Sequence, residues 1–206
     1  MFDRITKRLF GAAGCATGMG AEPLEPRQLL TVNVVSPIDD LFVDRSAPPS
    51  IVSLDGRYDA PDLDGTIARF DTVLGLINVL LEDARTPATV ANFLRYVDAD
   101  LWDNTIFHRS AENFVIQGGG FIRPDLDFDP PREVPDFDPV VNEPGISNTR
   151  GTIAMAKQAD MPNSATNQWF FNLGDNSGNL DFQNGGFTFF GRIILGLDVF
   201  DAIASV

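Results

Sequence analysis

The feature that most constrains the fold of this chain is a short mixed run near its middle. Residues 107–120 read Phe-His-Arg-Ser-Ala-Glu-Asn-Phe-Val-Ile-Gln-Gly-Gly-Gly. If residues 110–113 form a turn between two β-strands, the alternation of side chains brings Arg109, Phe114 and Gln117 onto one face. The glycines that follow leave room for another backbone to approach closely. The run therefore indicates either an apolar surface with a cation and an amide above it, suited to a short peptide, or an ordinary core hairpin with a surface arginine.

Several other runs predict strands. Residues 66–70 and 76–81 are rich in β-forming residues and flank a turn that ends in Gly75, which is a hairpin signal. Residues 148–172 are strand-like at both ends and carry a long polar loop between them. The part of the chain after residue 65 is therefore expected to be mainly β.

Two segments predict helices. Thr86 is a typical N-cap residue, and Pro87 suits the first helical position. An apolar stripe at helical spacing follows, formed by Val90, Phe93, Leu94 and Val97. We expect this helix to cover one open end of a sheet or barrel, and residues 196–203 to form a second helix.

Composition excludes several classes of partner and site. The chain carries 29 acidic and 15 basic residues, a net charge of −14, and an acidic surface of this kind repels phosphate backbones, so we expect no nucleic acid partner. No apolar run is long enough for a membrane span. With one cysteine and one histidine, neither an internal disulfide nor the usual Cys/His zinc site is expected. The aspartates of residues 121–141 lack the glycine turn and closing glutamate of an EF-hand, which favours a solvated loop over a calcium site.

The N-terminal part predicts export. Residues 1–20 place three basic residues ahead of Leu9-Phe10 and a run of small residues, which resembles a weak export signal. Residues 24–30, Leu-Glu-Pro-Arg-Gln-Leu-Leu, resemble a short motif found near the N termini of many large exported bacterial proteins. We expect residues 1–30 to be a disordered export or sorting segment, 31–65 a linker with an added edge strand, and 66–206 the domain. The periplasm, the cell surface and the extracellular space are the expected locations, with the cytoplasm as the alternative.

The run Phe107-His108-Arg109 followed by Phe114-Val115-Ile116-Gln117-Gly118-Gly119 resembles the signature of the cyclophilins. Thr89–Phe93 with Tyr96 resembles the first helix of that family, and Met155-Ala156 with Gln168 and Phe170 resembles the second half of its site. At least four motifs in the family's order cover about residues 66–206. The resemblance implies a closed antiparallel β-barrel of about eight strands capped by two α-helices. Family members usually continue beyond the second helix into a final strand, so that strand is expected to be missing here unless the segment before Thr66 substitutes for it.

The resemblance also implies an activity, the cis-trans isomerisation of X–Pro peptide bonds, with Arg109 stabilising the twisted amide and Gln117 holding Arg109. Substrate-binding positions carried over from the family are Phe114, Val115, Ala156, Gln168, Phe170, Leu180, Phe187 and His108. A packed, hydrogen-bonded histidine is the alternative for His108. The family implies no cofactor and no metal, proline-containing polypeptides as partners, and we expect a monomer.

Three positions depart from well-known family members: Asn179 replaces an aromatic residue, Phe187 a histidine and Val115 a methionine. We therefore expect weak binding of cyclosporin-type ligands but persistent isomerase activity. A non-catalytic module that binds proline-containing peptides is the alternative function. A hydrolase is disfavoured, because the one histidine has no distinctive serine or cysteine motif around it.

Overall fold

The computed structural model describes residues 2–10, 33–34, 58–59, 65–124 and 129–206. The chain divides into two units, Met1–Leu9 with Gly65–Val206, and Phe10–Asp64. In the second unit, strands β2 (Asn33–Val34) and β3 (Tyr58–Asp59) pair with each other. Among the described residues of the expected linker, these two strands form a sheet of their own and are not part of the eight-stranded sheet. The remainder of the expected linker and residues 11–30 lie outside the described residues.

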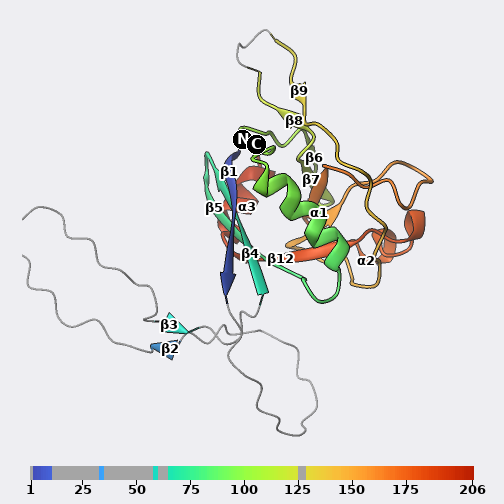
Figure 1. The fold of residues 1–206 in the computed structure, drawn as a ribbon, viewed down its shortest axis with the longest axis horizontal. Helices are drawn as coiled ribbons and strands as arrows, with labels where there is room; N and C mark the ends of the chain where they lie inside the picture. Colours follow the sequence, from blue (N-terminus) through green and yellow to red (C-terminus); the bar gives the residue numbers. More distant parts are fainter. Residues whose placement is uncertain (1, 11–32, 35–57, 60–64, 125–128) are drawn as a thin grey trace, which may run out of the picture. The chain divides into compact units, whose positions relative to one another are not determined.

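The first unit is built on one eight-stranded sheet in the order β1-β4-β5-β12-β10-β11-β7-β6 (Figure 1). Its strands are β1 (Phe2–Phe10), β4 (Gly65–Thr72), β5 (Gly75–Leu81), β6 (Arg109–Ala111), β7 (Val115–Gly118), β10 (Thr152–Met155), β11 (Trp169–Asn172) and β12 (Phe189–Leu195). Strands β8 (Phe121–Ile122) and β9 (Arg132–Glu133) form a separate pair. The fold is mainly β as expected, and closure of the sheet into a barrel stays a prediction.

The N-terminal residues correct one expectation. Residues 2–10 were expected to belong to a disordered segment, but they form β1 and neighbour β4 at one end of the sheet. An unpaired strand edge exposes backbone N–H and C=O groups, and a further strand satisfies them. Ile5 is buried in the main core, which adds apolar contact to the pairing. The segment before Thr66 thus supplies a strand beside β4, a pairing that depends on residues far along the chain.

Both predicted hairpins are confirmed. Strands β4 and β5 pair in antiparallel register from Ile67↔Leu80 to Thr72↔Gly75, around a turn that ends in Gly75. In the central run, β6 and β7 pair through Arg109↔Gln117 and Ala111↔Val115. The turn between them spans residues 112–114, slightly later than the sequence pattern indicated.

The first helix, α1 (Pro87–Asp98), begins where predicted, but its cap differs. The Thr86 hydroxyl donates to the Glu82 carbonyl and makes no cap bond. Instead, the Glu143 carboxylate accepts hydrogen bonds from the backbone N–H groups of Ala88 (3.2 Å) and Thr89 (2.8 Å) and from the Thr89 hydroxyl (2.7 Å). A carboxylate at this end of a helix satisfies unpaired donors and interacts favourably with the helix dipole.

Two further helices occur among the described residues. Helix α3 (Leu197–Ala204) confirms the second predicted helix. Helix α2 (Ser177–Leu180) is short and corrects the expectation of two helices. It was missed because four residues are too few to show an apolar stripe. None of the helices described here has the length and apolar character that crossing a bilayer requires.

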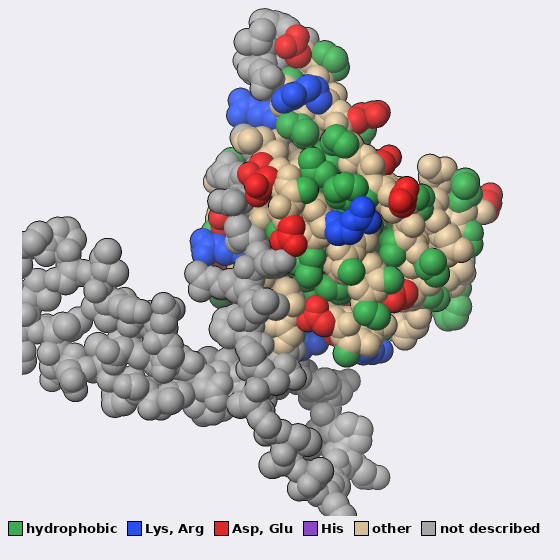
Figure 2. Space-filling model, viewed as in Figure 1, with side chains coloured by type: hydrophobic (Ala, Val, Ile, Leu, Met, Phe, Trp, Pro, Cys, Tyr) green, Lys and Arg blue, Asp and Glu red, His purple; other side chains and the backbone are tan. Residues whose placement is uncertain are grey.

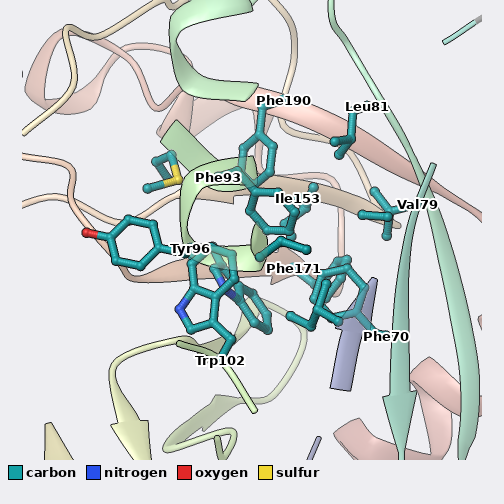
Figure 3. Close-up of a cluster of buried hydrophobic side chains, with 14 of the residues drawn as sticks. Phe70, Val79, Leu81, Phe93, Tyr96, Trp102, Ile153, Phe171 and Phe190 are labelled. Carbon is teal, nitrogen blue, oxygen red and sulfur yellow. The ribbon is translucent and has the colours of Figure 1, made fainter. Parts of the chain in front are cut away.

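The main core is aromatic and lies between the sheet and helices α1 and α3 (Figure 3). Phe93 of α1 lies 5.1 Å from Phe190 and 6.1 Å from Phe70, measured between ring centroids. On the other side, Phe200 of α3 contacts Phe171 at 5.9 Å. The first two ring pairs are tilted and the third meets edge-to-face, and aromatic contacts of these kinds add to the stabilisation from burial. The core thereby fixes the strands that carry the candidate site on their opposite faces.

Candidate active site

The hairpin β6–β7 holds the cation and the amide together. Arg109 stands opposite Gln117 in the register, and its Nη1 donates to the Gln117 Oε1 at 3.4 Å. The Gln117 Nε2 in turn donates to the Gln168 Oε1 at 2.7 Å. Gln168 thus fixes which way the Gln117 amide faces, so that its oxygen is presented to Arg109.

A cavity of about 250 Å³ lies beside Arg109. Most of its lining residues were predicted as site residues: Arg109, Phe114, Val115, Gln117, Ala156, Phe170, Leu180 and Phe187. The structure therefore brings together residues from four separate parts of the sequence. The Arg109 side chain is exposed, but its Cζ lies 6.0 Å from the centroid of the Phe114 ring. The guanidinium therefore stands at the mouth of an apolar pocket.

The back of this pocket is a small apolar cluster, distinct from the main core. It consists of the buried residues Val115, Ala154, Phe170 and Leu180, with Phe114, Ala156 and Phe187 packed against them. The rings of Phe170 and Phe187 meet edge-on at 5.7 Å. A pocket of this size and character suits a compact apolar ring.

Two lining residues are not among the predicted site residues, Lys157 and Gln183, although the resemblance to cyclophilins implies that the backbone near Lys157 binds the peptide. The Lys157 ammonium donates to the carbonyls of Asn184 (2.9 Å) and Gly186 (2.6 Å) and lies 4.7 Å from the Phe187 ring centroid. Burial lowers the pKa of Lys157 from its ordinary value. Lys157 thus ties the loop that carries Phe187 to the end of β10. Asn184 and Gly186 follow Lys157 by 27 and 29 residues, so the sequence around Lys157 does not indicate these hydrogen bonds.

A second cavity of about 270 Å³ adjoins the first and is more polar. The two share Gln117, Ala156 and Lys157, and Gln168 lines only the second. Together they form an extended hollow with an apolar end and a polar end.

Of the predicted site residues, His108 stands apart, since it lines neither of these two cavities in the described part of the chain. Its ring packs edge-on against Phe121 at 4.9 Å, and its backbone N–H donates to the Gln117 carbonyl. Burial lowers the pKa of His108, a hydrogen bond with Gln168 raises it, and the nearby Arg109 charge lowers it. This geometry favours the packed alternative, because the ring is half-buried against Phe121 and lines neither cavity.

The glycine run permits the close approach that the sequence indicated. Gly119 has a φ of +82°, and a Cβ there would lie 2.5 Å from the carbonyl oxygen of Asn167. A Cβ at Gly118 would lie 2.8 Å from the Trp169 ring. These positions let β7 and β11 meet over the large Trp169 side chain.

The absence of a nucleic acid partner stays a prediction that rests on the charge of the chain. On the face shown in Figure 2, acidic and basic side chains are scattered among apolar ones. The formal net charge of −14 makes this an unsuitable surface for a phosphate backbone.

The part of the chain that contains these residues matches known proteins. Residues 67–206 match the family described as cyclophilin type peptidyl-prolyl cis-trans isomerase/CLD. A peptidyl-prolyl cis-trans isomerase of Acinetobacter baylyi is 40% identical over 147 residues, covering 70% of this chain and 74% of that protein. One of Streptomyces antibioticus is 43% identical over 142 residues, covering 66% and 81%. The solved structure of a cyclophilin-type isomerase of Cryptosporidium parvum, in the presence of the dipeptide Ala-Pro, has a TM-score of 0.53 at 23% identity, covering 66% of this chain and 83% of that one.

Proposed function

The chain belongs to the cyclophilin-type peptidyl-prolyl cis-trans isomerase family, and from that premise we propose that Arg109 and its pocket accelerate rotation about X–Pro bonds in polypeptides. Homologues of 40% identity and above carry the name of this activity, so the chain is an isomerase by family. The observation that carries the assignment of residues is the placement of a guanidinium at the mouth of an apolar cavity.

The reaction breaks no covalent bond. Amide resonance sets a barrier of about 18–20 kcal/mol to rotation, and uncatalysed X–Pro rotation takes roughly tens to hundreds of seconds. In the twisted amide the prolyl nitrogen becomes pyramidal, and its lone pair is no longer delocalised into the carbonyl. The nitrogen can then accept a hydrogen bond. A donor aimed at that nitrogen therefore binds the transition state in preference to the planar ground state.

Arg109 is the donor in the described pocket that fits this role. A hydrogen bond to a charged group contributes about 1.5–3 kcal/mol, which corresponds to roughly one to two decades of rate. Gln117 keeps the guanidinium from turning away, because its Oε1 accepts from Nη1 while Gln168 holds its Nε2. The three side chains thus form one ordered set.

The apolar cluster supplies the part of the rate enhancement that does not come from the Arg109 hydrogen bond. Phe114, Phe170 and Leu180 would hold the proline ring still while the chain on one side rotates, and holding reacting groups in place lowers the barrier. The Cryptosporidium parvum relative was solved in the presence of Ala-Pro, and a dipeptide of that chemistry fits the apolar and polar ends of the present site.

A protease-coupled assay with an Ala-Pro-containing peptide tests the proposal. We expect the wild type to be clearly faster than the uncatalysed reaction, and Arg109→Ala to lose roughly one to two decades of kcat/KM. Because Arg109 is exposed, this variant should remain folded. A wild-type protein that is no faster than background, yet binds the peptide in calorimetry, identifies the non-catalytic binding module instead. An Arg109→Ala protein with wild-type kcat/KM contradicts the role of the guanidinium.

We also propose that the protein acts outside the cytoplasm, because residues 24–30 resemble a motif found near the N termini of many large exported bacterial proteins. Fractionation of cells that express the full chain tests this. Recovery in the periplasmic, surface or extracellular fraction supports export, and recovery in the cytoplasm contradicts it.

A further inference from the structure

Behind the proline pocket lie three buried asparagines, Asn148, Asn172 and Asn176, which we call the asparagine network. Asn148 and Asn172 are fully buried, and Asn176 is 8% exposed. Resting on the function proposed above, we propose that this network positions the walls of the proline pocket relative to one another and so sets its affinity for substrate. Its members are positioning residues, because they do not line the pocket themselves.

The three side chains are bonded head to tail. The Asn176 Nδ2 donates to the Asn172 Oδ1 at 2.8 Å, and the Asn172 Nδ2 donates to the Asn148 Oδ1 at 3.3 Å. The Asn172 Nδ2 also donates to the Thr152 hydroxyl oxygen at 2.9 Å, while the Thr152 hydroxyl donates to the Thr149 carbonyl. Each NH₂ group thus donates two hydrogen bonds, and each link uses a donor of one amide and an acceptor of the next.

The two ends of the network bond to the backbones of two different lining residues of the pocket. At one end, the Asn176 Nδ2 donates to the Phe114 carbonyl at 2.8 Å. At the other end, the Asn148 Nδ2 donates to the Phe187 carbonyl at 3.1 Å and to the Asp181 carboxylate at 2.9 Å. Phe114 and Phe187 both line the pocket. A single buried set of amides therefore spans from one wall to the other.

The backbone extends the same connection to a third wall residue. The Leu180 N–H donates to the Asn176 carbonyl, and the Phe187 N–H donates to the Leu180 carbonyl, both at 2.8 Å. The Asn176 N–H donates to the Asn148 carbonyl at 2.9 Å. Short helix α2, which ends at Leu180, has no side-chain cap bond and depends on these contacts for its place.

The chemistry of the network explains why amides are required. A carboxylate has the same shape as an amide but only accepts hydrogen bonds, whereas Asn172 must accept one and donate two. In a buried site, a group left without its partner costs the full desolvation penalty. Asn172→Asp would place an oxygen against the Asn148 Oδ1 and against a threonine hydroxyl whose proton is already donated. The network would be broken at its centre with almost no change in volume.

The test compares Asn172→Asp with a control of reduced stability. Val79→Ala removes buried volume from the main core and touches neither the network nor the pocket cluster. Both variants are assayed in the folded state, at a temperature below their unfolding transitions. We expect Asn172→Asp to lower kcat/KM by about fivefold or more, mainly through a higher KM, because misplaced walls weaken the hold on the proline. Val79→Ala should keep kcat/KM within about twofold of wild type, because it removes no interaction with the transition state.

Nuclear magnetic resonance adds a readout that lost stability alone does not move. In Asn172→Asp, the amide signals of Phe114 and Phe187 should both shift, because the carbonyls of both residues are bonded to the network. In Val79→Ala these signals should stay in place.

Asp181→Ala covers the case in which Asn172→Asp does not fold. Asp181 is half-buried at the end of the network, and its loss should lower kcat/KM in the same direction by a smaller factor. If the folded variants keep the wild-type KM and the Phe114 and Phe187 signals are unmoved, the inference is wrong while the isomerase assignment stands. A wild type no faster than background overturns the function itself.

Discussion

Strands β7, β10 and β11 bury side chains on both faces, and the two faces are built from different chemistry. On one face Ile116, Ile153 and Phe171 enter the main core, where large aromatic rings fill the space. On the other face Val115, Ala154 and Phe170 form the back of the pocket. Side chains alternate along a strand, so neighbours in sequence serve opposite faces.

The difference between the faces shows how one sheet separates stability from recognition. The core face is packed with aromatic and aliphatic side chains, and the Tyr96 hydroxyl and the Trp102 Nε1 within it are hydrogen-bonded to backbone groups. The pocket face is left partly open at its rim and is supported from behind by asparagine amides, which hold the backbone of the walls without filling the cavity. If the two faces are separate in function, substitutions on the core face should lower the free energy of unfolding, and substitutions on the pocket face should lower kcat/KM.

The largest expected effect is on the core face. Phe93→Ala should reduce the free energy of unfolding by about 3–5 kcal/mol, because Phe93 is fully buried against Phe190 and Trp102. Denaturation in urea measures the loss. The folded fraction should keep the wild-type KM. A raised KM in folded protein would show that the core shapes the pocket directly.

The next prediction concerns stability and the cap of α1, where the Glu143 carboxylate accepts hydrogen bonds from the first turn of the helix. Glu143→Gln should cost about 1–2 kcal/mol of stability, because an amide cannot accept all the hydrogen bonds that the carboxylate receives from Ala88 and Thr89. Urea denaturation again measures it. Asp138→Asn, at an exposed acid in the same segment, is the matched control and should leave stability nearly unchanged.

On the pocket face, Phe187→Ala should act on kinetics. Phe187 lines the pocket, so its loss removes an apolar contact with the bound proline, and a loss of about 0.5–1.5 kcal/mol of transition-state binding is roughly a two- to tenfold fall in kcat/KM. The protease-coupled assay measures it, with Phe182→Ala as control. Phe182 lies in the same loop but is 79% exposed, and its loss should change nothing. Equal effects of the two variants would contradict the pocket assignment.

The smallest expected effect concerns His108. Its pKa is lowered from 6.5, chiefly by burial, so the unfolded chain binds a proton more readily than the folded one. The free energy of unfolding should therefore rise with pH between the lowered value and 6.5, and fall as pH drops through that range. His108→Gln should flatten this slope in urea denaturation at a series of pH values, and it should leave KM unchanged if the ring is a packing residue. The chain has one histidine, so the assignment is direct.

The parts of the fold that were predictable depend on local patterns. The hairpin of residues 107–120, the start of α1 at Pro87 and the helix after Gly196 follow from turns, strand propensity and apolar spacing within a few residues. The pocket residues were found through motifs resembling a known family rather than through spacing alone. The contacts of the Lys157 side chain and of the three asparagines were not predicted, because an isolated polar residue in a loop or at a strand end does not indicate its hydrogen-bond partner.

The sequence by itself determined the hairpins β4–β5 and β6–β7, the starts of α1 and α3, which residues carry the cation and the amide, and the acidic net charge. Only the tertiary structure decided that Glu143 rather than Thr86 caps α1, that residues 2–10 pair beside β4, and that three asparagines meet behind the pocket. The physical reason is that local preferences act over a few residues, whereas a buried hydrogen bond depends on two groups that folding alone brings together. Asn176 and Phe114, 62 residues apart in sequence, have no relation until the strands between them are paired.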